Sequence, residues 1–170
     1  MDVAALGMLH YPDPRLRRVA KPVEDFGPWL DALIARMFEI MRDHKGVGLA
    51  APQVGVDLRL FVMNATGEAV DDRVYLNPKL DQRSGWAEAE EGCLSLPGIN
   101  VQVRRSVKCR LIAQDRNGKP IEAISSGFVS RIWQHEIDHL DGVMIIDKMA
   151  PSEAIAVRKV LRSLEADYEE

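Results

Sequence analysis

Residues 126–142, with the sequence SGFVSRIWQHEIDHLDG, predict a helix with little surface left for water. Side chains that favour burial recur along two stripes at helical spacing. The first stripe contains Phe128, Ile132, His135 and His139, and the second contains Val129, Trp133, Ile137 and Leu140. A helix covered on both sides belongs at the centre of a domain. We expect it to begin near Ser125 or Ser126 and to end at Gly142.

The segments around this helix predict an α+β fold. A helix with one apolar stripe follows Pro28 and stops near Gly46, and residues 151–168 predict a helical tail. Strands are predicted at residues 58–64, 74–80, 99–103 and 106–115. The Asn-Gly pair within residues 115–120 predicts a hairpin turn. No repeat or linker interrupts residues 1–170, so we expect one domain, with mixed or antiparallel strands around the central helix.

The composition narrows the functional classes. The 170 residues carry a formal net charge of -4 with no long run of one sign, which disfavours a DNA-binding surface and favours peptide-like partners. Two cysteines are too few for a disulfide framework. No stretch approaches the roughly 20 apolar residues of a membrane span, and the N-terminus lacks a signal or transit pattern. We therefore expect a cytoplasmic protein without membrane contact.

His135, Glu136 and His139 form an H-E-x-x-H pattern on the predicted central helix. Residues four apart lie about 40° apart in azimuth and ~6 Å apart along the axis, so both imidazoles can aim at one metal ion. Glu136 is offset in angle, which suits a general base better than a ligand. The alternative is two core histidines held by hydrogen bonds. Burial favours the metal, because unpaired imidazoles in an apolar interior are costly.

The third metal ligand distinguishes the families that share this pattern. Metzincins have a third histidine six residues after the second histidine of the pattern, where this chain has Ile145. Thermolysin-like enzymes have a glutamate about twenty residues downstream, where this chain has Arg158 and Lys159. Neither class fits. Cys93, in the turn-like stretch EEGCLSLPG, is the strongest remaining candidate, since a thiolate is a good ligand for a borderline metal. Cys109 alternates with Val107, Leu111 and Ala113 on a strand and is expected to be a small core residue.

A third stretch, GVGLAAPQVG at residues 46–55, combines glycines and small residues with a single polar side chain, Gln53. Backbone of this kind can approach a ligand closely. The alternative is an ordinary loop after a helix.

Together, GVGLAAPQ, EGCLS and QHEIDHL resemble the three motifs of the peptide deformylases, in the same order and spacing. The similarity extends from YPDPRLRRVAKPV at residues 11–23 to the helical tail. The resemblance implies one divalent metal bound by Cys93, His135 and His139, usually Fe²⁺ in the cell and often replaced by Ni²⁺, Co²⁺ or Zn²⁺. It also implies a reaction, which is removal of the formyl group from the N-terminal formyl-methionine of new polypeptides.

On this basis the residues predict roles in the hydrolysis. Glu136 is expected to take a proton from the attacking water and return it to the leaving amine. The backbone N–H of Leu94 and the side-chain amide of Gln53 are expected to hold the developing oxyanion together with the metal.

The same resemblance predicts how a formylated peptide binds. The peptide is expected to lie extended against the backbone of Val47, Gly48 and Leu49, and the methionine side chain to enter a pocket near Phe128 and Ile132. Family members often read Val-Pro-Arg where this chain has Val103, Arg104 and Arg105. The matching arginine, Arg105, is counted with the substrate-binding residues, and the local turn is expected to differ at Arg104.

Two further functions remain open at this point. Another metal-dependent amidohydrolase would use the same site on a different acyl group, and an inactive relative would only bind. Arg158, Lys159 and Arg162 on the helical tail are either a solvated basic face, which is the commoner case, or a docking surface for the ribosome.

Overall fold

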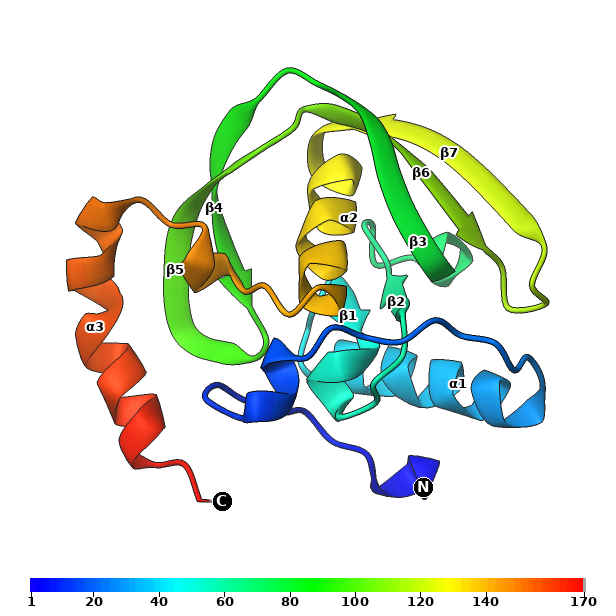
Figure 1. Cartoon of the computed structure of the whole chain (residues 1–170), viewed down its shortest axis with the longest axis horizontal. Coiled ribbons are helices and arrows are strands. Elements are labelled where there is room, and N and C mark those ends of the chain that lie inside the picture. Colours follow the sequence, from blue (N-terminus) through cyan, green and yellow to red (C-terminus); the bar gives the residue numbers. More distant parts are fainter. Residues whose placement is uncertain (170) are drawn as a thin grey trace.

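The computed structural model describes residues 1–169 and shows an α+β fold (Figure 1). The predicted fold class is confirmed. The helices are α1 (Pro28–Asp43), α2 (Gly127–Leu140) and α3 (Pro151–Ala166). The strands are β1 (Gly48–Ala50), β2 (Leu60–Met63), β3 (Arg73–Ser84), β4 (Ala87–Cys93), β5 (Leu96–Arg105), β6 (Lys108–Gln114) and β7 (Pro120–Ser126).

The strands form two separate sheets. The larger sheet has five strands in the order β1-β2-β3-β6-β7, and the smaller one is the β4–β5 hairpin. Every neighbouring pair in both sheets is antiparallel. In Figure 1 the hairpin stands on one side of α2, while β3, β6 and β7 lie on the other. The helix is therefore placed between the two sheets.

The helix α2 packs against the large sheet through one face. Trp133, Ile137 and Leu140 are buried in a cluster that also contains Phe61 and Tyr75 from β2 and β3. The rings of Tyr75 and Trp133 meet edge to face with 6.2 Å between their centroids, a favoured aromatic geometry. The prediction of a central buried helix is confirmed.

Two details of the α2 prediction need correction, namely the end of the helix and the burial of Phe128. The helix begins at Gly127, directly after Ser126, as predicted, and the φ of +65° at Gly127 allows the sharp change from β7 to helix. It ends at Leu140, before the predicted end at Gly142. Phe128, in the first turn of the helix, is 54% exposed. The apolar stripe is covered only from the second turn onward.

The helix α1 has the predicted apolar stripe. Its buried face contacts the core side of β1 and β2 through Leu30, Leu33, Ile34, Met37 and Met41. The helix ends at Asp43, and the N–H of Gly46 donates to the carbonyl of Met41 beyond its end. Residues 46–47 then lead directly into β1, whose Leu49 packs against α1, so the helix supports the glycine-rich stretch.

Three strands were not predicted, and one inward residue was misplaced. β4 has the sequence AEAEEGC, which lacks the β-branched and aromatic residues that mark strands. β1 and β7 are also additional to the prediction. Val107 is exposed because it lies between β5 and β6, whereas Cys109, Leu111 and Ala113 are buried as predicted. The β6–β7 turn lies at the Asn-Gly pair, although only Gly118 has a positive φ there.

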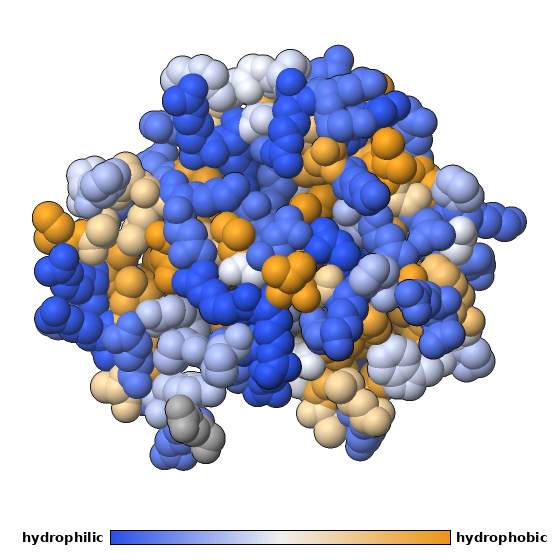
Figure 2. All heavy atoms as spheres, in the orientation of Figure 1, coloured by the Kyte–Doolittle hydropathy of each residue, from blue (hydrophilic) through white to orange (hydrophobic). Residues whose placement is uncertain are grey.

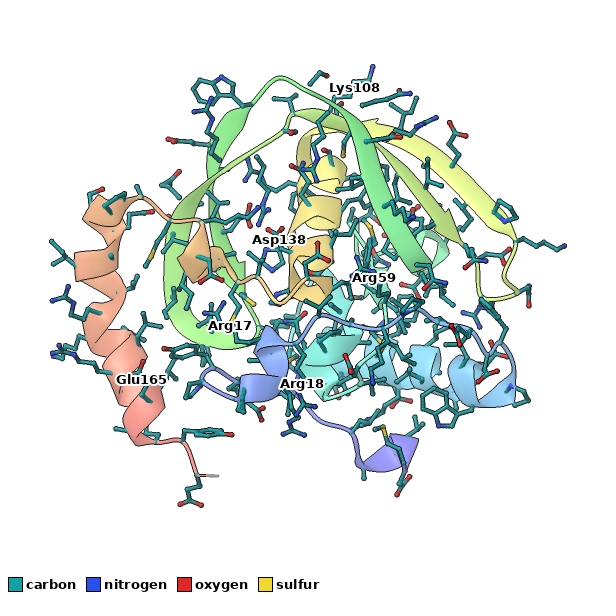
Figure 3. All side chains as sticks on the ribbon, viewed as in Figure 1. Arg17, Arg18, Arg59, Lys108, Asp138 and Glu165 are labelled. Atoms are coloured by element: carbon teal, nitrogen blue, oxygen red, sulfur yellow. The ribbon has the colours of Figure 1, made fainter. Side chains whose placement is uncertain are left out.

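The tail helix α3 lies against the outer side of the β4–β5 hairpin. Val157 is buried with Val101 and Val103 of β5, and Glu153 accepts a hydrogen bond from the backbone N–H of Gln102. Tyr11 donates a hydrogen bond to Glu165, which Figure 3 labels on this helix. Within residues 1–169, no helix combines the length and apolar character that crossing a membrane requires. On the face drawn in Figure 2, hydrophilic residues surround separate apolar patches.

Candidate metal centre

Cys93, His135 and His139 are brought together at the centre of the molecule. One ligand atom from each lies within 4.8 Å of the other two. Cys93 Sγ is 3.3 Å from His139 Nε2, and the bond lengths of a tetrahedral site place sulfur and nitrogen ligands about 3.6 Å apart. One sulfur and two imidazole nitrogens are donors that suit a borderline divalent metal. The three residues therefore fit a metal ion.

The two histidines contribute from consecutive turns of α2, while Cys93 comes from the end of β4. The β4–β5 register breaks between Gly92 and Cys93, where the hairpin turns through Leu94 and Ser95. Cys93 is the last residue of β4, immediately before this turn. This is close to the turn that the sequence predicts.

The surroundings shift the pKa values of the two histidines in opposite directions. Burial lowers the pKa of His139 well below its ordinary value, and the positive charges of His135 and Arg105 act in the same direction, so its imidazole is neutral. Burial also acts to lower the pKa of His135, but hydrogen bonds with Cys93 and Glu91 and the charge of Glu136 outweigh it and raise the pKa to about 10. The position beside His135 therefore favours positive charge.

Glu91 orients His135, and the sequence did not identify this role. Its Oε1 lies 2.9 Å from His135 Nδ1, which directs the other ring nitrogen toward the metal position. Burial acts to raise the pKa of Glu91, but hydrogen bonds from His135 and Arg105 and the charge of Arg105 hold it well below its usual range. The sequence offered no clear signal for this contact, because β4 lacks the residues that mark strands.

Arg105 does not line the cavity, which corrects its predicted place beside the substrate. Its side chain is 2% exposed and donates to both oxygens of Glu91 at 2.7 and 2.9 Å. A third bond of 2.8 Å joins it to Asp138, which Figure 3 labels on α2. The guanidinium of Arg105 donates its hydrogen bonds to these two carboxylates, so Arg105 can influence the metal site only through Glu91 and Asp138.

Glu136 is buried next to the metal position and to β1. Its Oε1 lies 4.0 Å from His135 Nε2. A Cβ atom on Gly48 would lie 2.6 Å from the same oxygen, so only glycine leaves room for the carboxylate. Burial raises the pKa of Glu136 to about 7 against the opposing charges of His135 and Arg105. A carboxylate with this pKa can accept and return a proton near neutral pH.

Gln53 points its amide nitrogen into the same site. Its Oε1 accepts a hydrogen bond of 2.9 Å from the N–H of Ala50. Its Nε2 lies 3.1 Å from Ser95 Oγ and 3.7 Å from Cys93 Sγ. The Ala50 contact thus fixes the orientation of the amide and leaves its donor side facing the sulfur.

A cavity of about 810 Å³ opens beside these groups. Nine of the predicted site residues line it, namely Val47, Gly48, Gln53, Cys93, Leu94, Phe128, Ile132, His135 and Glu136. His139, Leu49 and Arg105 do not. The side chain of Leu49 is buried in the core with the residues of α1.

The strand β1 is the edge of the large sheet and borders this cavity. The carbonyl of Val47 accepts from the N–H of Asn64 on the β2 side. Neighbouring residues of a strand direct their backbone groups to opposite sides, so those of Gly48 face the open edge. An extended peptide could add to the sheet here.

Cys109 lies apart from the centre, on the other side of α2. It is fully buried, and its Sγ is 3.2 Å from Ser130 Oγ. The sequence did not predict a polar neighbour such as this hydroxyl, but Cys109 is a core residue as expected.

The model of the polypeptide deformylase family matches residues 5–154. The chain belongs to the polypeptide deformylase family. A peptide deformylase of Chromobacterium violaceum is 43% identical over 163 residues, which cover 96% of this chain and 98% of that protein. One of Thermotoga petrophila is 42% identical over 153 residues, covering 89% and 92%.

Solved structures of the deformylase family share the fold. The structure of a peptide deformylase from Legionella pneumophila has a TM-score of 0.89 and 43% identity, and covers 97% of this chain and 100% of that chain. A plant peptide deformylase has a TM-score of 0.93 and 38% identity, covering 97% and 91%. The family resemblance stated from the motifs is therefore confirmed.

The departure at Arg104 has a structural explanation. Its guanidinium lies over the ring of Trp86, 3.8 Å from the centroid, and Arg104 lies opposite Glu88 in the register of the β4–β5 hairpin. This stack is on the outer face of β5, away from the metal ligands. A second arginine at this place is compatible with the deformylase site.

Proposed function

We propose that this member of the deformylase family removes the formyl group from N-terminal formyl-methionine at the centre formed by Cys93, His135 and His139. The observation that carries the proposal is the meeting of one sulfur and two imidazole nitrogens beside a buried carboxylate, at the edge of an open strand. These parts supply a metal site, a base and a place for a peptide backbone.

The three ligands would hold one divalent ion, and we propose Fe²⁺ in the cell, with Ni²⁺, Co²⁺ or Zn²⁺ as replacements. Sulfur and imidazole donors suit all of these ions. When bound, the ion would polarise the formyl carbonyl and lower the pKa of a water molecule in the site. Glu91 would keep His135 in the tautomer that binds it, through the contact of 2.9 Å at Nδ1.

Glu136 is proposed as the general base and then the general acid. It would take a proton from the attacking water and give it to the leaving amine of the methionine. Its burial and its pKa of about 7 suit both steps. Gly48 leaves the space that this carboxylate occupies.

Gln53 and Leu94 are proposed to hold the oxyanion that develops on the formyl oxygen. Gln53 is fixed by Ala50 and presents Nε2 on the side of Cys93. Leu94 follows Cys93 directly in the chain, in the turn that lines the cavity. Two neutral donors can stabilise the negative charge without adding a competing one.

The peptide is proposed to extend along β1. The peptide would lie beside Val47, Gly48 and Leu49 and would form its backbone hydrogen bonds at Gly48, whose groups face the open edge. Such bonds would not depend on the peptide's side chains, which suits an enzyme that accepts many different chains. The methionine side chain would enter the cavity between Phe128 at the mouth and the buried Ile132.

A comparison of two peptides tests this function. The anaerobically purified, metal-loaded protein is expected to release formate from formyl-Met-Ala-Ser, whereas acetyl-Met-Ala-Ser should be turned over far more slowly. Removing the metal with a chelator should abolish the activity, and adding Fe²⁺ or Co²⁺ should restore it. Equal turnover of the acetyl peptide would indicate a different amidohydrolase. No turnover with metal bound would indicate a binding protein.

We also propose the ribosome as a partner and the cytoplasm as the compartment. Arg158, Lys159 and Arg162 are exposed on α3. Among residues 1–169, none of the three has a salt-bridge partner within 4.0 Å. An unpaired basic face can meet the phosphates of ribosomal RNA. The proposed substrates, new formylated chains, emerge at the surface of the ribosome.

A further inference from the structure

Arg131 lies in the wall of the cavity that is proposed to hold the methionine side chain. It is on α2, one turn before His135, and lines the cavity with Phe128 and Ile132. At about 100° per residue, these three residues share one face of the helix, with Arg131 and Ile132 on opposite flanks. Its side chain is only 15% exposed. A long cationic side chain in this position has to be held by specific partners.

The guanidinium of Arg131 is fixed at three points on the β4–β5 hairpin. Nη1 donates to Glu91 Oε2 at 2.6 Å and to the carbonyl of Val103 at 3.0 Å. Nη2 donates to the carbonyl of Ala87 at 2.9 Å. Ala87 and Glu91 belong to β4 and Val103 to β5. A planar fork with this many partners has little freedom, so the aliphatic stem of Arg131 is held across the space between α2 and the hairpin.

This space is not closed by the hairpin itself. The hairpin forms no hydrogen-bonded ladder with the large sheet and stands beside α2 (Figure 1). Between Ala87 and Glu91, the residue on the same face of β4 is Ala89, which contributes only a methyl group to the cavity. The stem of Arg131 therefore sets the width of the pocket on this side.

We propose that Arg131 is a specificity-determining residue of the methionine pocket, where its fixed stem forms the wall that excludes side chains wider than methionine. The proposal rests on the proposed deformylase function, since the pocket would hold the side chain of the substrate's formylated methionine. The unbranched methionine side chain fits beside an unbranched stem. An aromatic ring needs more width than this wall leaves.

Two substitutions and two substrates test the proposal. The readout is the ratio of kcat/KM for formyl-Phe-Ala-Ser to that for formyl-Met-Ala-Ser. Arg131→Ala removes the wall and should raise this ratio about tenfold, the scale on which pocket contacts discriminate. Arg131→Met keeps an unbranched stem but frees its end, and should raise the ratio about threefold. A purely structural loss would lower both values together and leave the ratio unchanged.

Arg110→Ala is the matched control. Arg110 is also fixed by two carboxylates, Asp81 and Glu122, but it lies on β6 and does not line the cavity. The substrate ratio of this variant should equal that of the wild type. An unchanged ratio in both Arg131 variants, with metal content and circular dichroism retained, would overturn the proposal. If Arg131→Ala does not fold, the ratio for Arg131→Met decides.

A binding measurement separates this proposal from the reaction itself. Calorimetry with the products Met-Ala-Ser and Phe-Ala-Ser should show the same shift in the ratio of Kd values in the Arg131 variants. Absence of formate release by the wild type would contradict the proposed function alone. Unchanged product Kd ratios in the variants would contradict the assignment of Arg131 even if formate were released.

Discussion

The two faces of α2 each have a cysteine as neighbour but serve different purposes. The cavity face carries His135 and Glu136, together with His139, which does not line the cavity itself but contacts Cys93 of the hairpin. The sheet face carries Ser130 and Trp133, and its cysteine neighbour is Cys109 of β6. The first face places its polar groups beside an open cavity. The second face buries its own polar groups within the core.

The difference shows that the partners of a buried polar group decide its role. Cys93 Sγ lies near His139 Nε2 and Gln53 Nε2, at 3.3 and 3.7 Å. Cys109 Sγ meets a serine hydroxyl and apolar side chains. A thiol beside two imidazoles can become a thiolate ligand. A thiol among apolar groups behaves as a small hydrophobic residue.

The largest expected effect is on the cavity face. Cys93→Ala should abolish stoichiometric metal binding, because a catalytic site of this kind holds its metal with only three protein ligands and this variant would keep two. Metal analysis of the anaerobically purified variant would measure this, with the wild type as reference. Full metal content in Cys93→Ala would remove the thiolate from the site and erase the contrast between the two cysteines.

Glu91→Gln tests the support behind this face. The amide keeps the shape of the side chain but loses the charge that pairs with Arg105 and Arg131. We expect metal affinity to fall about 10- to 100-fold, and the free energy of unfolding to fall by about 3–5 kcal/mol, as for other broken buried ion pairs. Competition with a chelator and denaturant unfolding measure the two effects.

The control for Glu91→Gln is Glu122→Gln. Glu122 also pairs with an arginine, Arg110, but it is exposed on β7. Its loss should change stability by less than about 1 kcal/mol and leave metal affinity unaltered. Metal affinities that fall equally in both variants would contradict the role of Glu91.

The sheet face should respond only in stability. Cys109→Ala removes one buried sulfur atom and its contact with Ser130, and we expect a loss of about 1 kcal/mol. Metal content and kcat/KM for formyl-Met-Ala-Ser should match the wild type. Loss of the metal from this variant would mean that the two faces of α2 are coupled more tightly than their contacts indicate.

The smallest effect on catalysis is expected at α3, which belongs to neither face. Reversing the charges of Arg158, Lys159 and Arg162 should weaken co-sedimentation with ribosomes, and raising the salt should reduce the difference. Turnover of formyl-Met-Ala-Ser should stay the same. Unaltered ribosome binding at low salt would favour a solvated basic face, and lost turnover would mean that the tail supports the hairpin.

The local part of the site was predictable from the sequence, and its long-range part was not. His135, Glu136 and His139 lie within five residues of one helix, so their common face follows from helical geometry alone. The buried stripe of α1 is predictable for the same reason. The assignment of Cys93 as third ligand was possible because a thiolate suits a borderline metal and because EGCLS matches a motif of the family.

The roles of Glu91, Arg105 and Arg131 depend on how the hairpin meets α2. These residues lie up to 40 positions apart in the chain, and their ion pairs form only in three dimensions. The hairpin itself was only half predicted, because β4 consists of alanine, glutamate, glycine and cysteine, which carry weak strand signals. The partners of a buried charge therefore could not be assigned without the fold.

The most direct test of the cavity face compares Glu136→Gln with the wild type in a single experiment, by measuring metal content and formate release on the same anaerobic preparations. The carboxylate is proposed as a base and not as a ligand, so the variant should retain one metal ion per chain. Its turnover of formyl-Met-Ala-Ser should fall by about 10² to 10⁴, the usual cost of removing a general base. Lost metal, or turnover near the wild-type rate, would contradict the account.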